Sequence, residues 1–429
     1  MLQQAKEKSY SHETPIEDLR VPLDRLKDNI EILGRHGYQP SDHGIYRMAF
    51  TEADVKSRKW LMDQMSEIGM AVCQDGAGNV IGHWPPDNRE PAVIIGSHTD
   101  TVPCGGKLDG SLGVMTGLEC ARTLIEAEVR TEHPIEIISF SDEEGRFGGM
   151  LGSQAFTGQL TPDLILNAVD LNGIKLPDAM KHQGFDPLGA LDARREPDTI
   201  QAYLELHIEQ GPVLDHLKKS VGIVDEITGL FRWSARLVGT ANHAGTTPME
   251  MRQDAFLGLA EFANELPRIL EENGSERSRA TIGNVSLNPG AANTVPGAAE
   301  FSLDVRDTDP DRLEELFNSF RKALSAIARR RKLHFEFEEV SRIEPVHCDP
   351  EVVKALRAQA DRMNISHELM PSGAAHDAQL VAGMAPVGLI FVPSQDGKSH
   401  SPAEWTPWHD IETGANLILQ TAIQLMKPL

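Results

Sequence analysis

The sequence predicts an α/β protein with a mostly parallel sheet, into which a smaller α+β unit is inserted. Residues 92–96 and 134–140 are short apolar runs with the composition of buried strands, and residues 111–127 between them have apolar residues at helical spacing. Strands that alternate with helices in this way are typical of a parallel sheet. The chain has 429 residues, too many for one ordinary hydrophobic core, so we expect two domains.

The first part of the chain contributes further elements around these strands. Residues 57–70 follow a helical spacing, and residues 71–84 predict a hairpin around a Gly-Asn turn. Residues 170–198 are rich in Gly, Pro and charge, which indicates a surface connection with a short helix.

The middle of the chain follows a different pattern. A strand, a helix, two strands, a second helix and a last strand are expected at residues 231–239, 246–270, 279–290, 298–307, 309–330 and 332–340. This β-α-β-β-α-β order is that of a ferredoxin-like two-layer unit. A helix, a strand and a helix then return at residues 351–363, 385–393 and 410–426. The simplest interpretation is one α/β domain formed by residues 1–214 and 341–429, interrupted by an α+β domain at residues 215–340.

Composition excludes some classes of function. The net charge of −23 argues against binding to nucleic acid or to an anionic membrane surface, since both need a basic face. No apolar run approaches the roughly 20 residues of a membrane span, and residues 1–19 lack the apolar core of a secretion signal. The four cysteines are scattered without CxxC spacing, so we expect a reduced, cytoplasmic protein.

The segment at residues 96–113 places a histidine and an aspartate in a glycine-rich loop directly after an apolar strand. In α/β enzymes such strand ends are where the chemistry is located, and imidazole and carboxylate are ligands of borderline divalent metals. Other imidazoles and carboxylates follow apolar strands or lie in loops flanked by Gly and Ser. The candidate ligands are His98, Asp109, Glu144, His207 and His400. They suffice for two metal ions that share one carboxylate, and none lies in the inserted unit. Such a set accepts zinc, which we expect first, or manganese, cobalt or nickel.

The adjacent carboxylates Glu143 and Glu144 follow the second apolar strand. Neighbouring side chains point in different directions, so one carboxylate can bind metal while the other acts as general base toward a water. The alternative is an acidic loop in an acidic protein.

Longer motifs support a more specific interpretation. They are, in order, GSHTDTVPCGGKLDG, DEEGRF, ELHIEQGPVL, ANHAGTTPM, GAANTVPGAAEFSLDVRD, SGAAHDAQ and GKSHSPAE. With them the chain resembles, over nearly its whole length, the carbamoylase and allantoate-amidohydrolase branch of the binuclear aminoacylase–carboxypeptidase superfamily. The branch includes N-carbamoyl-L-amino-acid hydrolase, β-ureidopropionase, allantoate amidohydrolase and ureidoglycolate amidohydrolase. The resemblance implies a di-metal hydrolase domain and an inserted lid domain that also forms a homodimer interface.

The resemblance also implies a role for each candidate ligand. Asp109 would bridge the two metal ions. His98 and His207 would complete one site, and Glu144 and His400 would complete the other.

The remaining roles implied by the resemblance concern catalysis and substrate binding. Glu143 would be the general base and would then protonate the leaving nitrogen. The residues that would face the substrate are Gln210, His243, Asn293, Arg306 and His376. Within this set, His243 would stabilise the oxyanion across a dimer interface, while Asn293 and Arg306 would hold the substrate carboxylate. The alternative for Arg306 is a structural ion pair with a neighbouring aspartate of its own strand.

The activity that the resemblance implies is metal-dependent hydrolysis of the C–N amide bond of an N-carbamoyl or ureido acid. The first expectation is an N-carbamoyl-L-amino acid, with release of amino acid, CO2 and ammonia. The main alternative is an allantoate or ureidoglycolate amidohydrolase of purine breakdown. An aminoacylase or peptidase is disfavoured by the HIEQG motif, and an inactive metal-binding scaffold is disfavoured because no ligand or base is missing.

Two departures from the family pattern leave the exact substrate open. The loop after Glu144 reads EEGRFGG, where the family often reads EEGSRF. Ala375 precedes His376, where the family often has glycine. Neither departure removes a candidate ligand.

Overall fold

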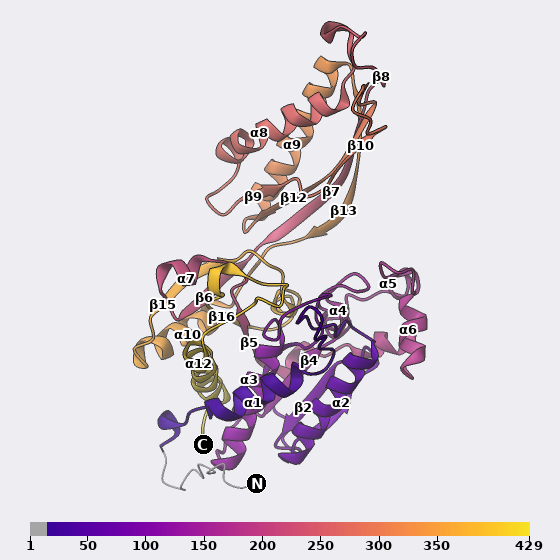
Figure 1. Cartoon of the computed structure of the whole chain (residues 1–429). Coiled ribbons are helices and arrows are strands. Elements are labelled where there is room, and N and C mark those ends of the chain that lie inside the picture. The colour runs from indigo at the N-terminus through magenta and orange to yellow at the C-terminus, as the bar shows by residue number, and fades with distance from the viewer. Residues whose placement is uncertain (1–14) are drawn as a thin grey trace. The chain divides into compact units, whose positions relative to one another are not determined.

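The computed structural model describes residues 15–429, which form two compact units (Figure 1). Unit 1 contains residues 15–225, Cys348–Met370 and His376–Leu429, and unit 2 contains Glu226–His347 and Pro371–Ala375. The boundaries lie later in the chain than those expected from the sequence. Residues 215–225 belong to unit 1, because the strand that begins at Val221 pairs with the sheet of that unit.

Unit 1 is built on a large mixed sheet. Its strands are β1 (Ala71–Gln74), β2 (Val80–Trp84), β3 (Ala92–His98), β4 (Ile135–Phe140), β5 (Ile200–Ile208), β6 (Val221–Ile227), β14 (Val346–His347), β15 (His367–Ser372) and β16 (Val387–Val392). Strand β14 and the last residues of β6 and β15 pair in this sheet but are among the residues of unit 2. The order is β1-β2-β4-β3-β5-β16-β6-β14, and β15 pairs with β6. The central strands β4, β3, β5 and β16 are parallel, and the strands at both margins are antiparallel. The predicted parallel centre is therefore confirmed.

Unit 1 also contains α-helices, several of which pack against this sheet. They are α1 (Leu23–Leu33), α2 (Glu52–Glu67), α3 (Ser111–Glu126), α4 (Leu151–Phe156), α5 (Pro162–Asn167), α6 (Leu176–His182), α7 (Val213–Leu217), α10 (Pro350–Arg362), α11 (Asp377–Val381) and α12 (Trp408–Met426). Helices α3 and α12 are buried over most of their lengths and pack on the parallel strands. A helix that is apolar on nearly all sides belongs in the centre of a large domain, so these two helices form the core with β3, β4, β5 and β16.

Unit 2 is a two-layer α+β unit. Its elements are β7 (Gly229–Val238), β8 (Asn242–His243), α8 (Ala255–Asn273), β9 (Arg279–Thr281), β10 (Val285–Asn288), β11 (Thr294–Val295), β12 (Ala298–Asp307), α9 (Pro310–Arg331) and β13 (His334–Ile343). The main sheet has the antiparallel order β10-β12-β7-β13, and α8 and α9 pack against it (Figure 1). The longer strands and the two helices follow one another along the chain in the β-α-β-β-α-β order.

Two helices differ from their predicted bounds. Residues 57–70 predict a helix, but α2 begins at Glu52 and ends at Glu67. The sequence pattern places a helix from residue 246, but α8 begins at Ala255. The side chain of Asp254 accepts a hydrogen bond from the backbone N–H of Leu257 and so caps the first turn. The residues before it include Pro248 and a single 3-10 turn at Met249–Met251.

Candidate functional site

The candidate ligands converge at one edge of the parallel strands in unit 1. His98 is the last residue of β3, and His207 is the penultimate residue of β5. Asp109 lies in the loop between β3 and α3. Glu144 lies in the loop after β4, and His400 lies in the loop after β16. Because parallel strands end at the same edge of a sheet, residues far apart in the sequence meet here.

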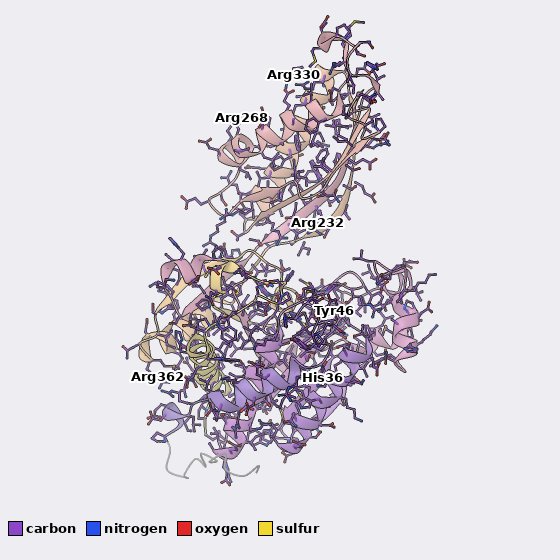
Figure 2. The ribbon with its side chains drawn as sticks, in the orientation of Figure 1. His36, Tyr46, Arg232, Arg268, Arg330 and Arg362 are labelled. Atoms are coloured by element: carbon purple, nitrogen blue, oxygen red, sulfur yellow. The ribbon has the colours of Figure 1, made fainter. Side chains whose placement is uncertain are left out.

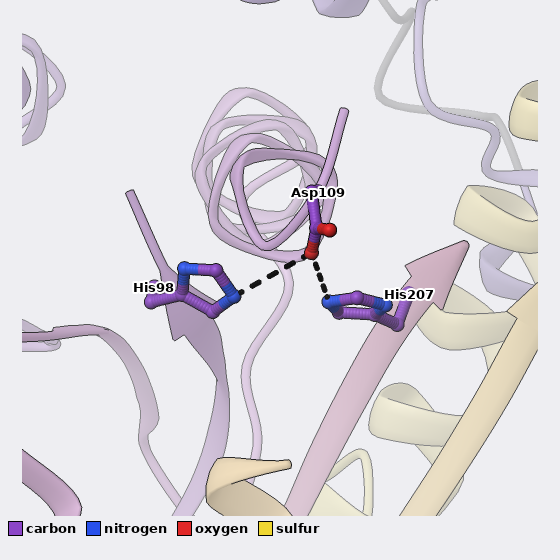
Figure 3. Close-up of side chains that lie close together, drawn as sticks. All are labelled: His98, Asp109 and His207. Carbon is purple, nitrogen blue, oxygen red and sulfur yellow. Dashed lines mark ion pairs between the residues drawn. The ribbon is translucent and has the colours of Figure 1, made fainter. Parts of the chain in front are cut away.

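Asp109 lies at the centre of this group (Figure 3). Its Oδ1 atom is 3.1 Å from Nε2 of His207 and 3.8 Å from Nε2 of His98. All three residues are buried, and their ligand atoms lie within 4.8 Å of one another. The residue after Asp109 must be small, because a Cβ on Gly110 would overlap the imidazole of His98 and because Gly110 has a φ of 62°.

The other oxygen of Asp109 faces a second group. Its Oδ2 atom lies 3.4 Å from Nε2 of His400, and the same nitrogen lies 3.5 Å from Oε2 of Glu144. The ligand atoms of Asp109, Glu144 and His400 also lie within 4.8 Å of one another. Asp109 therefore presents one oxygen to each of two histidine–carboxylate groups, which is the arrangement of a bridging ligand.

Backbone carbonyls orient the imidazoles of the first group. Nδ1 of His98 lies 3.1 Å from the carbonyl oxygen of Asp100, and Nδ1 of His207 lies 2.9 Å from that of Ile208. A ring nitrogen beside a carbonyl carries the proton, so Nε2 of each ring keeps its lone pair for a ligand. The backbone N–H of Gly110 donates to Nε2 of His207 at 3.1 Å, which agrees with that assignment. Burial lowers the pKa of His98 to about 4, so this ring is neutral at pH 7.

The donor set fits divalent metal ions. Each group combines imidazole nitrogen with carboxylate oxygen, the ligands that zinc and similar ions bind. Oε1 of Glu144 is buried and has no hydrogen-bond partner among the described residues. This oxygen is therefore available as a metal ligand. Burial, with repulsion from neighbouring carboxylates, raises the pKa of Glu143 and Glu144 well above their usual range. So many buried carboxylates in one place need positive charge to balance them.

Three further residues predicted for the site lie beside these groups. Oε2 of Glu143 is 3.5 Å from Nε2 of His98. Nε2 of Gln210 donates a hydrogen bond of 2.8 Å to Oδ2 of Asp109. The ring of His376 lies edge-on to that of His207, with 4.6 Å between the ring centroids.

His243 and Asn293 lie in unit 2, next to each other. The strands β8 and β11 pair with His243 opposite Thr294, and the backbone N–H of Ala244 bonds to the carbonyl of Asn293 at 2.9 Å. Both His243 and Asn293 are exposed, so their side chains are accessible to a ligand.

Arg306, also in unit 2, forms an ion pair with an aspartate of its own strand. Its Nε donates to Oδ1 of Asp304 at 2.8 Å, and its Nη1 donates to the carbonyl of Gly373 at 2.7 Å. Arg232, labelled in Figure 2, donates to Oδ2 of the same aspartate at 2.7 Å. Burial alone would raise the pKa of Asp304, but the two arginines lower it below its usual value. The ion pair that was the alternative for Arg306 is thus present.

Residues that no motif in the sequence marks fix the loops of the site. The carboxylate of Asp100 accepts the backbone N–H groups of Glu143 at 3.3 Å and Glu144 at 3.2 Å. Arg47 is completely buried, and its guanidinium donates to the carbonyl of Thr99 and to the hydroxyl of Ser111, on either side of the loop that contains Asp109. These residues bind backbone or neutral groups, and no spacing in the sequence marks such contacts.

The two departures from the family motifs are the residue Ala375 and the loop after Glu144. Ala375 does not have a positive φ, so its methyl group is compatible with an ordinary backbone. In the loop after Glu144, Arg146 bonds to Asp170 at 3.0 Å and to the carbonyl of Ala49 at 2.6 Å. Arg146 therefore connects the loop to two other segments of unit 1, at Asp170 and at Ala49.

A model of peptidase family M20/M25/M40 matches residues 94–424. The chain belongs to this family. M20 peptidases are generally dependent on two metal ions, and the two candidate groups agree with that requirement.

Relatives within the M20 family cover almost the whole chain. N-carbamoyl-L-amino acid amidohydrolase of Geobacillus stearothermophilus is 39% identical over 406 residues, which are 94% of this chain and 98% of the relative. Allantoate amidohydrolase of Bacillus subtilis (strain 168) is 33% identical over 403 residues, 93% of this chain and 97% of the relative. The crystal structure of an amidase of the hydantoinase/carbamoylase family from Burkholderia multivorans has a TM-score of 0.88 at 33% identity, and the match covers 96% of this chain and 100% of that chain. The resemblance to the carbamoylase and allantoate-amidohydrolase branch is therefore confirmed.

None of the helices in residues 15–429 is both long enough and apolar enough to cross a membrane.

The bridging position of Asp109 leads to a prediction about metal content. Asp109→Asn should remove both ions, because each group loses its shared carboxylate, whereas His400→Ala should remove one. Metal analysis after dialysis of the metal-loaded protein measures the stoichiometry. Asp63→Asn, an exposed change on α2, is the control and should retain two ions. Two ions per chain in Asp109→Asn would contradict the bridging geometry.

Proposed function

We propose that the chain is a metal-dependent hydrolase of the C–N amide bond of N-carbamoyl acids, with N-carbamoyl-L-amino acids as its main substrates. One water is consumed, and the products are the amino acid, CO2 and ammonia. The observation that supports the proposal most strongly is Asp109, which presents one oxygen to each of two histidine–carboxylate groups. The relatives named N-carbamoyl-L-amino acid amidohydrolase supply the substrate class.

Two divalent ions would be held by the groups around Asp109, one by His98 and His207 and the other by Glu144 and His400. When bound, they supply Lewis acidity, which polarises the substrate carbonyl and lowers the pKa of a water. We expect zinc first, with manganese, cobalt and nickel as alternatives, because ligand chemistry alone does not select among these metals.

Glu143 is the proposed proton carrier. Its neighbour Glu144 is a ligand in this proposal, while Oε2 of Glu143 lies on the side of His98, 3.5 Å from that ring. From there Oε2 takes a proton from the attacking water and returns it to the leaving nitrogen. Gln210 and His376, which lie beside Asp109 and His207, orient the ureido group of the substrate.

The residues of unit 2 would complete the site. His243 would donate to the oxyanion, and Asn293 and Arg306 would hold the carboxylate of the substrate. We propose that unit 2 serves as the lid and as the interface of a homodimer, in which the partner chain supplies His243. The exposure of His243 and Asn293 supports this role, because neither side chain is committed to the core of its own unit.

The proposal is tested by ammonia release from a small panel of substrates. Metal-loaded protein is assayed with N-carbamoyl-L-amino acids, N-carbamoyl-β-alanine, allantoate and ureidoglycolate, with and without chelator. Chelator-sensitive turnover of a carbamoyl amino acid supports the proposal. Turnover of allantoate or ureidoglycolate alone would instead favour the alternative, an amidohydrolase of purine breakdown. The similarity to allantoate amidohydrolase of Bacillus subtilis (strain 168) keeps that alternative in the panel.

Glu143→Gln should abolish turnover without loss of metal, because an amide cannot carry the proton and Glu143 is not a proposed ligand. Turnover and metal content are measured on the same preparation. Glu271→Gln, an exposed change on α8, is the control and should be fully active. Full activity in Glu143→Gln would refute the assignment of the base.

His243→Ala should lower kcat by about 100-fold or more, the scale of losing one oxyanion donor. His334→Ala, which removes an exposed histidine from β13 of the same unit, is the matched control and should leave kcat unchanged. The measurement is kcat on the best substrate of the panel. A change below about threefold in His243→Ala would remove His243 from that role.

A further inference from the structure

Glu404 is a buried carboxylate next to the site that has no role in the proposed reaction. Its exposed fraction is 5%. Its Oε1 atom accepts the backbone N–H of Leu108 at 2.8 Å and that of Asp109 at 3.1 Å. Glu404 thus binds the backbone of Asp109, although the two residues are 295 positions apart in the chain.

The loop that contains Glu404 contacts both the side chain and the backbone of Asp109. Ser399 donates its hydroxyl to Oδ2 of Asp109 at 3.0 Å, and Nε2 of His400 lies 3.4 Å from the same oxygen. Residues 399–400 therefore contact the side chain of Asp109, while Glu404 contacts its backbone. Two contacts of this kind fix both the position and the direction of a carboxylate.

Gly106 provides the space for Glu404. A Cβ at position 106 would lie 2.5 Å from Cδ and 2.7 Å from Cβ of Glu404, closer than any real contact. Gly106 does not have a positive φ, so an alanine would be compatible with its backbone conformation. The reason for glycine at this position is therefore the close approach of Glu404.

A buried carboxylate is an unfavourable choice for packing alone. Removing a carboxylate from water is opposed by its lost hydration, and an apolar side chain of similar size would avoid that penalty. Oε1 compensates part of the penalty through its two backbone hydrogen bonds, but Oε2 has no partner among the described residues. The structural effect of this burial is that the backbone at Asp109 is held in one position by two hydrogen bonds.

We propose that Glu404 is a positioning residue that fixes the bridging carboxylate of Asp109 relative to His400, and that Gly106 is glycine in order to admit it. The inference rests on the proposed metal roles of Asp109 and His400. Residues that orient metal ligands typically change metal affinity or activity by about 10- to 100-fold when they are removed.

The first test compares Glu404→Ala with Glu404→Gln in the full chain. Co²⁺ is titrated into the metal-free protein, and its affinity and visible absorption spectrum are recorded. Glu404→Ala should weaken Co²⁺ binding by about 10- to 100-fold and change the spectrum. Glu404→Gln should restore most of the affinity, because the amide oxygen accepts the same two N–H bonds. Glu271→Ala is the matched control, and thermal melting checks that each variant is folded.

The second test uses Gly106. Gly106→Ala should weaken Co²⁺ binding to a similar extent, because the new Cβ displaces Glu404. In the Glu404→Ala background the same change should have little further effect, since the space is then open. Gly283→Ala, at an exposed glycine with no close neighbour, is the control.

The outcomes separate this inference from the proposed function. A wild-type chain that binds no Co²⁺ would overturn both. Two Co²⁺ ions in the wild type, with unchanged affinity and spectrum in Glu404→Ala, would overturn this inference alone. Equal losses in Glu404→Ala and Glu404→Gln would show that the charge acts, not the two hydrogen bonds, and would also overturn it. Additive losses in the double variant would overturn the role of Gly106.

Discussion

The site depends on one buried carboxylate whose two oxygens face different partners. Its Oδ1 atom lies 3.1 Å from Nε2 of His207, and its Oδ2 atom lies 3.4 Å from Nε2 of His400. Asp109 can hold this position only because the chain around it is fixed from several sides. Gly110 makes room for the ring of His98, Glu404 binds the backbone, and Arg47 ties both ends of the loop. Removing any of these contacts would leave a charged group without a defined direction in a medium of low polarity.

Much of the fold follows from patterns that are local in the sequence. The parallel centre was predictable because apolar runs alternate with a helix at residues 111–127, and a parallel pair needs such a crossover. The start of unit 2 was not predictable, because it lies at Glu226, inside β6, and because only Thr228 separates β6 from β7. Their membership of different sheets is decided by pairing, with Val224 opposite Leu389 in unit 1 and Phe231 opposite Val305 in unit 2. Periodicity reports which residues are apolar and not which strand lies beside them.

The candidate ligands were easier to find than the residues that position them. Imidazoles and carboxylates at strand ends have a chemical signature, and parallel strands bring such ends to one edge. Asp100 and Glu404 have no comparable signature, because each accepts hydrogen bonds from backbone N–H groups. Every residue except proline has such a group, so the side-chain types in the sequence do not identify the partners. Gly106 is a similar case, because only the neighbour that would collide with a Cβ explains it. Long-range contacts to the backbone therefore mark the limit of what this sequence predicts.

Charge sets a further condition on the proposed reaction. The chain has a net charge of −23, and its site concentrates carboxylates, so an anionic substrate is repelled unless cations are supplied. In unit 1 the proposed metal ions are those cations. In unit 2 the proposed cation is Arg306, whose guanidinium is already bound to Asp304 and to the carbonyl of Gly373. A guanidinium has five N–H donors, and the bonds of Arg306 to Asp304 and Gly373 use three of them. One N–H on Nη1 and one on Nη2 therefore remain for the proposed substrate carboxylate, so the ion pair of Arg306 is compatible with that role.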